Sequence, residues 1–119
     1  MEELFPEASP AEIKLTKAHL KQYRDKKHKV ELFERNPPET DKQKRAQEAL
    51  IKFTSLIERA VDQILHKDVK SVIEYRFIKG NSRAATILKF SSWNCCEKTI
   101  DRKIEEGVVS VANTLLYLE

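Results

Sequence analysis

Apolar residues in the first third of the chain follow a spacing close to a heptad repeat. They recur with gaps of seven, three, seven and three residues, at Ile13, Leu20, Tyr23, Val30 and Phe33. A narrow apolar stripe on an otherwise charged segment predicts a long helix that packs on one neighbouring helix. The helix should begin after Ser9, because Ser9, Pro10 and Glu12 supply an N-cap, a first-turn proline and a capping box.

A wider apolar pattern follows a pair of prolines. Asn36-Pro37-Pro38-Glu39 must end the first helix, because proline lacks an amide hydrogen and clashes with the preceding turn. Thr40 or Asp41 then caps a second helix. Its steps of three and four residues predict the central helix of the fold. The apolar positions are Ala46, Ala49, Leu50, Phe53, Leu56, Ile57, Ala60, Val61, Ile64 and Leu65.

The two long helices are expected to form a helical hairpin, because only a short connection containing the two prolines separates them. One stripe should then face the other. The facing residues would be Ile13, Leu20 and Tyr23 on the first helix, and Phe53, Ile57 or Val61 on the second.

Shorter apolar segments fill the rest of the chain. Asp68 is a plausible cap for a short helix that Gly80 closes in the left-handed conformation, and Ser82 should cap the next helix. The apolar residues of the short helix are Val69, Val72, Ile73, Tyr75, Phe77 and Ile78.

Residues 82–104 carry the residue order of a helix-turn-helix unit. Trp93 would end the first helix as a core residue, and Asn94 would make the turn. Cys95 would tuck beneath the turn, and the second helix would open with polar residues before burying Ile100. A plain helical hairpin within a bundle is the alternative interpretation.

Two residues depart from this pattern. Phe90 stands four positions before the turn residue, where such units usually carry a small side chain. Gly107 costs about 1 kcal/mol inside a helix, so the second helix is expected to end or bend there. A further apolar face follows, which either closes the core or forms a dimer seam. The N-terminal stripe is the other candidate for a dimer seam. This face consists of Val108, Val111, Ala112, Leu115 and Leu116.

Composition agrees with an all-α fold. The 119 residues include only two glycines and four prolines, with 40% hydrophobic and 34% charged residues. We expect an N-terminal arm and helical hairpin over residues 1–66 and a helix-turn-helix domain over residues 67–119. The net charge of +3 permits nucleic-acid binding without requiring it. No apolar run approaches twenty residues and no signal peptide is present, so we expect a cytoplasmic protein without membrane contact.

The chemistry of metal sites and enzymes is poorly represented. Cys95 and Cys96 are adjacent and have no other cysteine to pair with, and none of the three histidines stands at a finger-like spacing from them. There is no glycine-rich phosphate loop and no nucleophile with a base partner. We therefore expect no metal, no cofactor and no enzymatic activity. The histidines are His19, His28 and His66.

From Val72 onward the chain resembles the C-terminal half of phage transcriptional regulators of the ArpU and RinA type and, more distantly, region 4 of sigma factors. Residues 73–77 resemble the segment that precedes the motif in those families. The motif itself resembles Leu-Gly-x-Ser-x-x-Thr-x-x-Arg, although tryptophan replaces leucine, asparagine replaces glycine and cysteine replaces serine. The matching residues are Trp93, Asn94, Cys96, Thr99 and Arg102.

The resemblance implies a sequence-specific regulator that binds double-stranded DNA, encoded by a phage or prophage and acting in the bacterial host cytoplasm. A contact with RNA polymerase is left open. We also expect a homodimer, because a single short recognition helix rarely supplies enough contacts. The cysteine at position 96 removes the usual hydroxyl cap of the recognition helix, so the start of that helix is open. The competing interpretation is a phage-encoded helical adaptor or antirepressor that binds a host or phage protein.

Helix geometry and the resemblance together assign roles to individual side chains. Lys98 and Arg102 lie four residues apart on one helix face, and Arg102 is the first candidate for a guanine contact. The alternative for Arg102 is an ion pair with Glu105 or Glu106. Arg83 would contact the DNA backbone from the preceding helix. The candidate DNA-binding residues are Arg83, Lys89, Cys96, Glu97, Lys98, Thr99, Asp101, Arg102 and Lys103.

Three of these assignments carry alternatives. Thr99 can donate to a phosphate or bond to its own helix backbone. Glu97 and Asp101 would repel phosphate unless they accept from cytosine amino groups, or unless the helix faces something other than DNA. A basic cluster in the first helix can also touch phosphates, although a solvated face is the favoured interpretation. This cluster consists of Lys21, Arg24, Lys26, Lys27 and Lys29.

Overall fold

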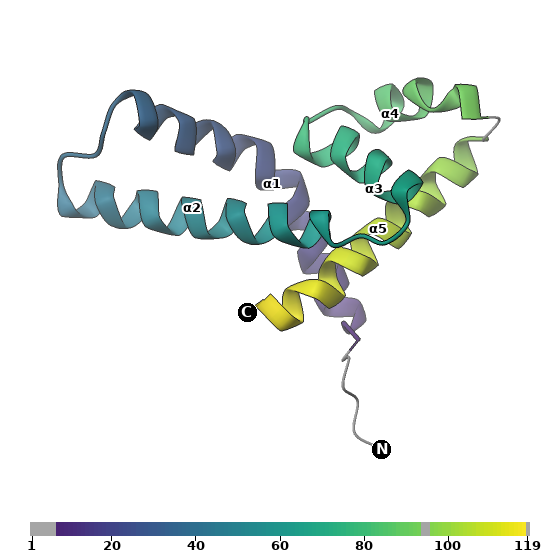
Figure 1. The fold of residues 1–119 in the computed structure, drawn as a ribbon, viewed down its shortest axis with the longest axis horizontal. Helices are drawn as coiled ribbons and strands as arrows, with labels where there is room; N and C mark the ends of the chain where they lie inside the picture. Colours follow the sequence, from purple (N-terminus) through teal and green to yellow (C-terminus); the bar gives the residue numbers. More distant parts are fainter. Residues whose placement is uncertain (1–6, 94–95, 119) are drawn as a thin grey trace, which may run out of the picture.

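The computed structural model describes residues 7–93 and 96–118, and most of these residues lie in helices. No β-strand occurs in these ranges, so the prediction of an all-α fold is confirmed for them. The α-helices, shown in Figure 1, are α1 (Pro10–Arg35), α2 (Asp41–Asp62), α3 (Lys67–Ile73), α4 (Arg83–Lys89) and α5 (Glu97–Leu118).

The predicted helix starts are confirmed at three caps. The Glu12 amide donates to Ser9 Oγ at 3.2 Å, and the Ser9 amide donates to Glu12 Oε1 at 2.8 Å. Thr40, rather than Asp41, caps α2 through a reciprocal pair of bonds with Gln43. Ser82 Oγ accepts from the amide of the third residue after it at 3.1 Å. These starts depend on local sequence alone, because each cap needs only its own first turn.

α1 and α2 run antiparallel and side by side over much of their length (Figure 1). The Tyr23 hydroxyl donates to the Glu58 carboxylate, and Lys27 Nζ lies 3.0 Å from the same carboxylate. Burial and the neighbouring Glu58 carboxylate raise the pKa of Tyr23 above its ordinary value. The residues predicted to face one another all belong to, or pack against, one buried cluster: Ile13, Leu20, Tyr23, Phe53, Ile57 and Val61.

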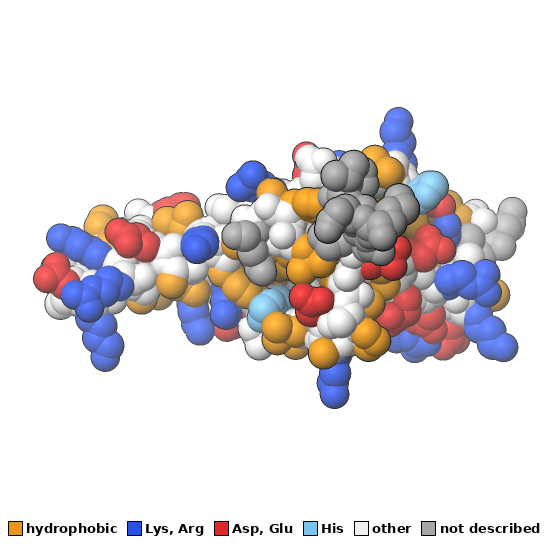
Figure 2. All heavy atoms as spheres, turned by 90° about the horizontal axis from the view of Figure 1, so that it is seen from below, with side chains coloured by type: hydrophobic (Ala, Val, Ile, Leu, Met, Phe, Trp, Pro, Cys, Tyr) orange, Lys and Arg blue, Asp and Glu red, His pale blue; other side chains and the backbone are white. Residues whose placement is uncertain are grey.

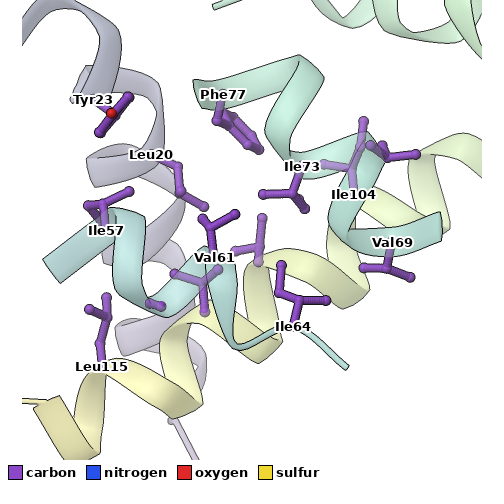
Figure 3. Close-up of a cluster of buried hydrophobic side chains, with 14 of the residues drawn as sticks. Leu20, Tyr23, Ile57, Val61, Ile64, Val69, Ile73, Phe77, Ile104 and Leu115 are labelled. Atoms are coloured by element: carbon purple, nitrogen blue, oxygen red, sulfur yellow. The ribbon is translucent and has the colours of Figure 1, made fainter. Parts of the chain in front are cut away.

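α5, rather than α2, is the helix on which the others converge. It packs against α1, α2, α3 and α4, and it runs diagonally from the connection after α4, past α3, and across α1 (Figure 1). Leu20 of α1, Val61 of α2 and Leu115 of α5 belong to the cluster that these helices enclose (Figure 3). The prediction that residues 41–65 form the central helix is therefore wrong. Leu65 follows the end of α2 and is 91% exposed.

α5 continues without interruption through Gly107, so the expected helix end at this residue does not occur. The glycine is buried against α3. A β-carbon at this position would overlap Ile73 Cγ1 and Cδ1 and would lie 3.3 Å from Val69 Cγ1. The absence of a side chain therefore allows α3 to pack closely on α5, which offsets the cost of a glycine inside a helix.

The end of α3 is fixed by residues that follow it. The helix continues as the π-helical segment η1 (Glu74–Ile78), and Gly80 then adopts a φ of 77°, as predicted for a left-handed terminating residue. Asn81 Nδ2 donates to the Tyr75 carbonyl at 2.9 Å, and Arg76 Nη1 donates to the Asn81 carbonyl at 2.7 Å. This turn leads directly into Ser82, which caps α4.

The start of α3 differs from the prediction. His66 occupies the N-cap position and its side chain makes no cap bond. Asp68 lies inside the first turn, where its carboxylate accepts from the Val69 amide at 3.0 Å and pairs with Lys103 of α5. Asp68 therefore links two helices instead of capping one, and the Lys103 ammonium helps to hold the pKa of its carboxyl below the ordinary value.

The predicted division at residues 66 and 67 falls in the turn between α2 and α3 and stays a prediction. A single buried cluster contains residues from both sides of it, such as Leu20, Ile57, Val72 and Ile104. Neither segment therefore buries its apolar face alone. Of the N-terminal arm, residues 1–6, including Leu4 and Phe5, lie outside the described residues.

The two apolar faces considered as dimer seams are used inside the chain. Val30 is buried, as are Val108, Val111 and Ala112. These buried residues are therefore not available to a second copy, and the position of a dimer seam stays a prediction. None of the helices in the described part of the chain combines the length and apolar composition that a membrane crossing needs.

Candidate nucleic-acid interface

α4 and α5 are joined by a short connection. α4 ends at Lys89, a 3-10 turn follows over Ser91–Trp93, and α5 begins at Glu97. The predicted turn residue Asn94 and the predicted tucked residue Cys95 lie outside the described residues. What the structure shows is therefore the position of the two helices and the residues at their ends.

Trp93 is not a core residue, which corrects the prediction. Its exposed fraction is 40%, whereas that of Phe90 is 7%. α4 ends before Trp93, so Phe90 turns inward and its ring lies 5.7 Å from the ring of Tyr75. The Trp93 ring lies 4.5 Å from Phe90 and covers it from outside. Phe90, the bulky residue that departs from the expected helix-turn-helix pattern, therefore anchors this end of α4.

Cys96 occupies the N-cap position of α5, which fixes the helix start that the sequence left open. The amides of Thr99 and Ile100 donate to its carbonyl oxygen at 3.0 and 3.2 Å. Its Sγ lies 3.4 Å from Thr99 Oγ1, and this contact together with nearby backbone amides lowers the pKa of the Cys96 thiol. Cys96 and Thr99 are thus engaged with each other in the first turn of α5.

Lys98 and Arg102 lie on the outer face of α5, as predicted. The inward face of the same segment carries Ile100, Ile104 and Val108, all of them buried. A helical repeat of 3.6 residues places Arg102 almost opposite this stripe. Both cations are exposed, and neither side chain forms an ion pair or hydrogen bond with another described residue. The alternative ion pairs of Arg102 with Glu105 or Glu106 do not form.

Glu97 and Asp101 both pair with Arg83 from α4, so one cation stands against two carboxylates. Arg83 Nε and Nη2 donate to the two Asp101 oxygens at 2.8 and 2.6 Å, and Nη2 also donates to Glu97 Oε1 at 2.6 Å. The guanidinium lowers the pKa of the Asp101 carboxyl, and the two carboxylates raise the pKa of Arg83. Nε and Nη2 of Arg83 are therefore engaged, and its predicted DNA-backbone contact stays a prediction.

Lys103 and Lys89 point elsewhere. Lys103 lies on the flank of α5 that faces α3, where it pairs with Asp68 and its side chain is only 19% exposed. Lys89 Nζ lies 5.9 Å from the centre of the Tyr75 ring at the end of α4. Of the nine candidate residues, the structure brings Lys98 and Arg102 together on the outer face of α5. The group formed by Arg83, Glu97 and Asp101 lies beside them.

A cavity that the sequence did not reveal lies beside this face. It has a volume of about 300 Å³. Lys17 of α1 pairs with Glu105 of α5 at 2.8 Å on its wall. No local signal predicts this contact, because its residues come from segments far apart in the chain. The lining residues are Lys17, Lys21, Arg76, Phe77, Arg83, Asp101, Ile104 and Glu105.

The basic cluster of α1 is largely engaged within the protein. Arg24 and Lys29 lie 3.5 and 3.3 Å from Glu31 and Asp25 of the same helix. Lys26 lies over the Phe53 ring, 4.1 Å from its centre. Positive side chains are mixed with negative ones at the end of the molecule where α1 connects to α2 (Figure 2). The pairing of these α1 cations within the protein agrees with the favoured interpretation, in which the basic cluster forms a solvated face.

Comparison of the chain with protein-family models, with curated proteins and with solved structures gave no match. The resemblance to ArpU- and RinA-type regulators therefore stays a prediction.

Proposed function

We propose that this protein binds double-stranded DNA through α4 and α5, arranged as a helix-turn-helix unit, and that it regulates transcription. The observation that carries the proposal is the outer face of α5. Lys98 and Arg102 are exposed within one turn of each other, near the start of a helix whose inward face is fully buried. Side chains near the start of a recognition helix are the ones that reach base edges in a major groove.

Electrostatics supports the same assignment. Glu97 and Asp101 would repel a phosphate backbone, but both pair with Arg83. Glu105 pairs with Lys17. Glu97, Asp101 and Glu105 are thus each engaged in an ion pair within the protein, with Arg83 shared between two of them, while Lys98 and Arg102 keep their donors available for an anionic partner.

The protein is expected to bind duplex DNA with a strong dependence on salt, because each neutralised phosphate changes the slope of log affinity against log salt by about −0.9. A random-site selection followed by a salt titration on the best duplex checks both sequence preference and phosphate contacts. A scrambled duplex of equal length is the control. Failure to bind either duplex at low salt would contradict the proposal and favour an adaptor that binds a protein.

Self-association is part of the proposal, since a single short recognition helix rarely supplies enough contacts. A groove of about 660 Å³ between the ends of α2 and α5 is the surface that a second copy fits. Its wall includes the exposed Leu65. It also carries Arg59 on α2 and Glu106 on α5, so a two-fold arrangement can pair the cation of one copy with the anion of the other.

The position of this groove agrees with the geometry of DNA. Arg102 and Thr114, which lines the groove, are separated by about 18 Å along α5 at 1.5 Å per residue. A two-fold axis that is perpendicular to α5 and crosses it at the level of Thr114, one of the lining residues between Glu106 and Leu118, would place the two Arg102 residues about 36 Å apart along the helix direction. Successive major grooves on one face of a duplex are separated by about 34–36 Å.

Leu65→Glu is expected to shift the protein toward the monomer, because it places a charge on the surface proposed to meet a second copy. Leu65 lies outside the folded core, so the melting temperature should stay unchanged. Sedimentation at tens of micromolar, with and without DNA, measures the effect. Leu32→Glu, at an exposed leucine of α1 outside the groove, is the matched control. A wild-type protein that stays monomeric with DNA present would contradict this part of the proposal.

A further inference from the structure

Two cations in the cavity between α1, η1, α4 and α5 lack an acidic partner. Arg76 is partly buried, and its interactions within the described chain are a bond from Nη1 to the Asn81 carbonyl and a contact with the Phe77 ring. Lys21 is exposed at the rim and forms no ion pair with a described residue. Burial lowers the pKa of Arg76, which indicates that its charge is poorly solvated.

The cavity wall as a whole is positive. Its cations are Lys17, Lys21, Arg76 and Arg83, against the two carboxylates of Asp101 and Glu105. Each carboxylate is already paired, Asp101 with Arg83 and Glu105 with Lys17. A partly buried guanidinium beside an unpaired ammonium is the arrangement that stabilises a bound anion, because the anion supplies the missing opposite charge.

We propose that this cavity receives a phosphate group of the DNA backbone, so that α1 and η1 extend the DNA interface beyond α4 and α5. Lys21 and Arg76 are the residues that hold the phosphate. This inference rests on the proposed function, and it assigns to Lys21 a role that distinguishes it from the other basic residues of α1.

The location of the cavity supports DNA as the source of the phosphate. Glu105, on the cavity wall, lies three residues after Arg102 and one helical turn after Asp101. The cavity therefore borders the α5 face that carries Lys98 and Arg102. A recognition helix lies between two phosphate backbones, so side chains that flank it meet phosphates rather than bases.

Guanidinium and ammonium groups suit this role for different reasons. The Arg76 guanidinium is planar and presents its remaining donors as a fork toward phosphate oxygens, while Lys21 acts as a flexible point charge. Arg76 is held in place by its bond to the Asn81 carbonyl, which the left-handed Gly80 positions. The phosphate site is thus built on the turn that ends η1.

The test uses the full chain and its best selected duplex. Lys21→Ala should reduce the magnitude of the slope of log affinity against log salt by about 0.9, which corresponds to one phosphate. In a phosphate-ethylation interference experiment, one interfering position seen with the wild type should disappear with Lys21→Ala. Lys42→Ala removes an exposed lysine of α2 that does not line the cavity, and it should leave both readouts unchanged.

The possible results separate the inference from the function. If the wild type binds the duplex but Lys21→Ala keeps the same slope and interference pattern, the phosphate site is wrong and the function stands. If neither protein binds duplex DNA, both fail. If inorganic phosphate alone raises the melting temperature of the wild type, but not that of Lys21→Ala, while DNA binding is unaffected, the cavity takes a small anion and the inference is overturned.

Discussion

Gly107→Val is expected to destabilise the protein by about 3 kcal/mol or more, enough to remove much of the stability of a small domain. The new β-carbon would overlap Ile73, and the two branch methyl groups would need further space between α3 and α5. Gly107→Ala should cost less, about 1–2 kcal/mol. The gain in helix propensity, about 1 kcal/mol, offsets only part of the overlap. Urea unfolding monitored by circular dichroism measures both.

The control for Gly107 is an exposed helix position outside the proposed interfaces. Glu48→Ala changes such a position in α2, so its effect on the free energy of unfolding should stay within about 0.5 kcal/mol. Ile73→Ala alone removes a buried side chain and should cost about 2–5 kcal/mol. Combined with Gly107→Ala it should cost less than the sum, because the alanine methyl fills part of the space left by Ile73. Additive effects would show that α3 does not meet α5 at this point.

The double variant Lys98→Ala/Arg102→Ala is expected to lose detectable DNA binding at physiological salt while staying folded. Arg102→Ala should remove a base contact of about 1–3 kcal/mol and relax the preference at one base position. Lys98→Ala should instead weaken specific and non-specific duplexes alike and reduce the salt slope by about 0.9. Both side chains point away from the buried Ile100, so the melting temperature should barely change.

Lys42→Ala/Arg45→Ala is the matched control, since it removes one exposed lysine and one exposed arginine from α2. It should bind DNA as the wild type does. Wild-type affinity in the Lys98/Arg102 variant would contradict the assignment of α5 and favour a protein-binding adaptor. Loss of folding would show that the wrong face of α5 had been assigned to DNA.

Features that depend on neighbouring residues could be predicted from the sequence. Ser9, Thr40 and Ser82 each cap a helix through atoms within a single turn, and Gly80 ends the π-helical segment after α3 in the left-handed conformation. The exposure of Arg102 also follows from local periodicity, because Ile100 and the later apolar residues define the buried face.

Features that depend on packing between distant segments could not be predicted. Gly107 suggests a helix end when only propensity is considered, but the close approach of Ile73 explains why glycine fits there. Trp93 is the larger apolar residue, yet the early end of α4 gives the buried position to Phe90. In the candidate interface, the pairing of Arg83 with Asp101 depends on how α4 sits on α5, which no spacing in the sequence specifies.

The convergence of the helices on α5 determines when this fold can close during synthesis. α5 is the last of the described helices to be made, and at 5–20 residues per second it follows the completion of α1 by roughly 4–17 s. Until then the apolar stripe of α1 can pack against α2 and η1 but not against α5. Even Ala8, just before α1, donates its amide to Asn113 of α5 at 2.8 Å. A nascent chain therefore exposes Leu20 and its neighbours for seconds, an interval in which a chaperone can bind them.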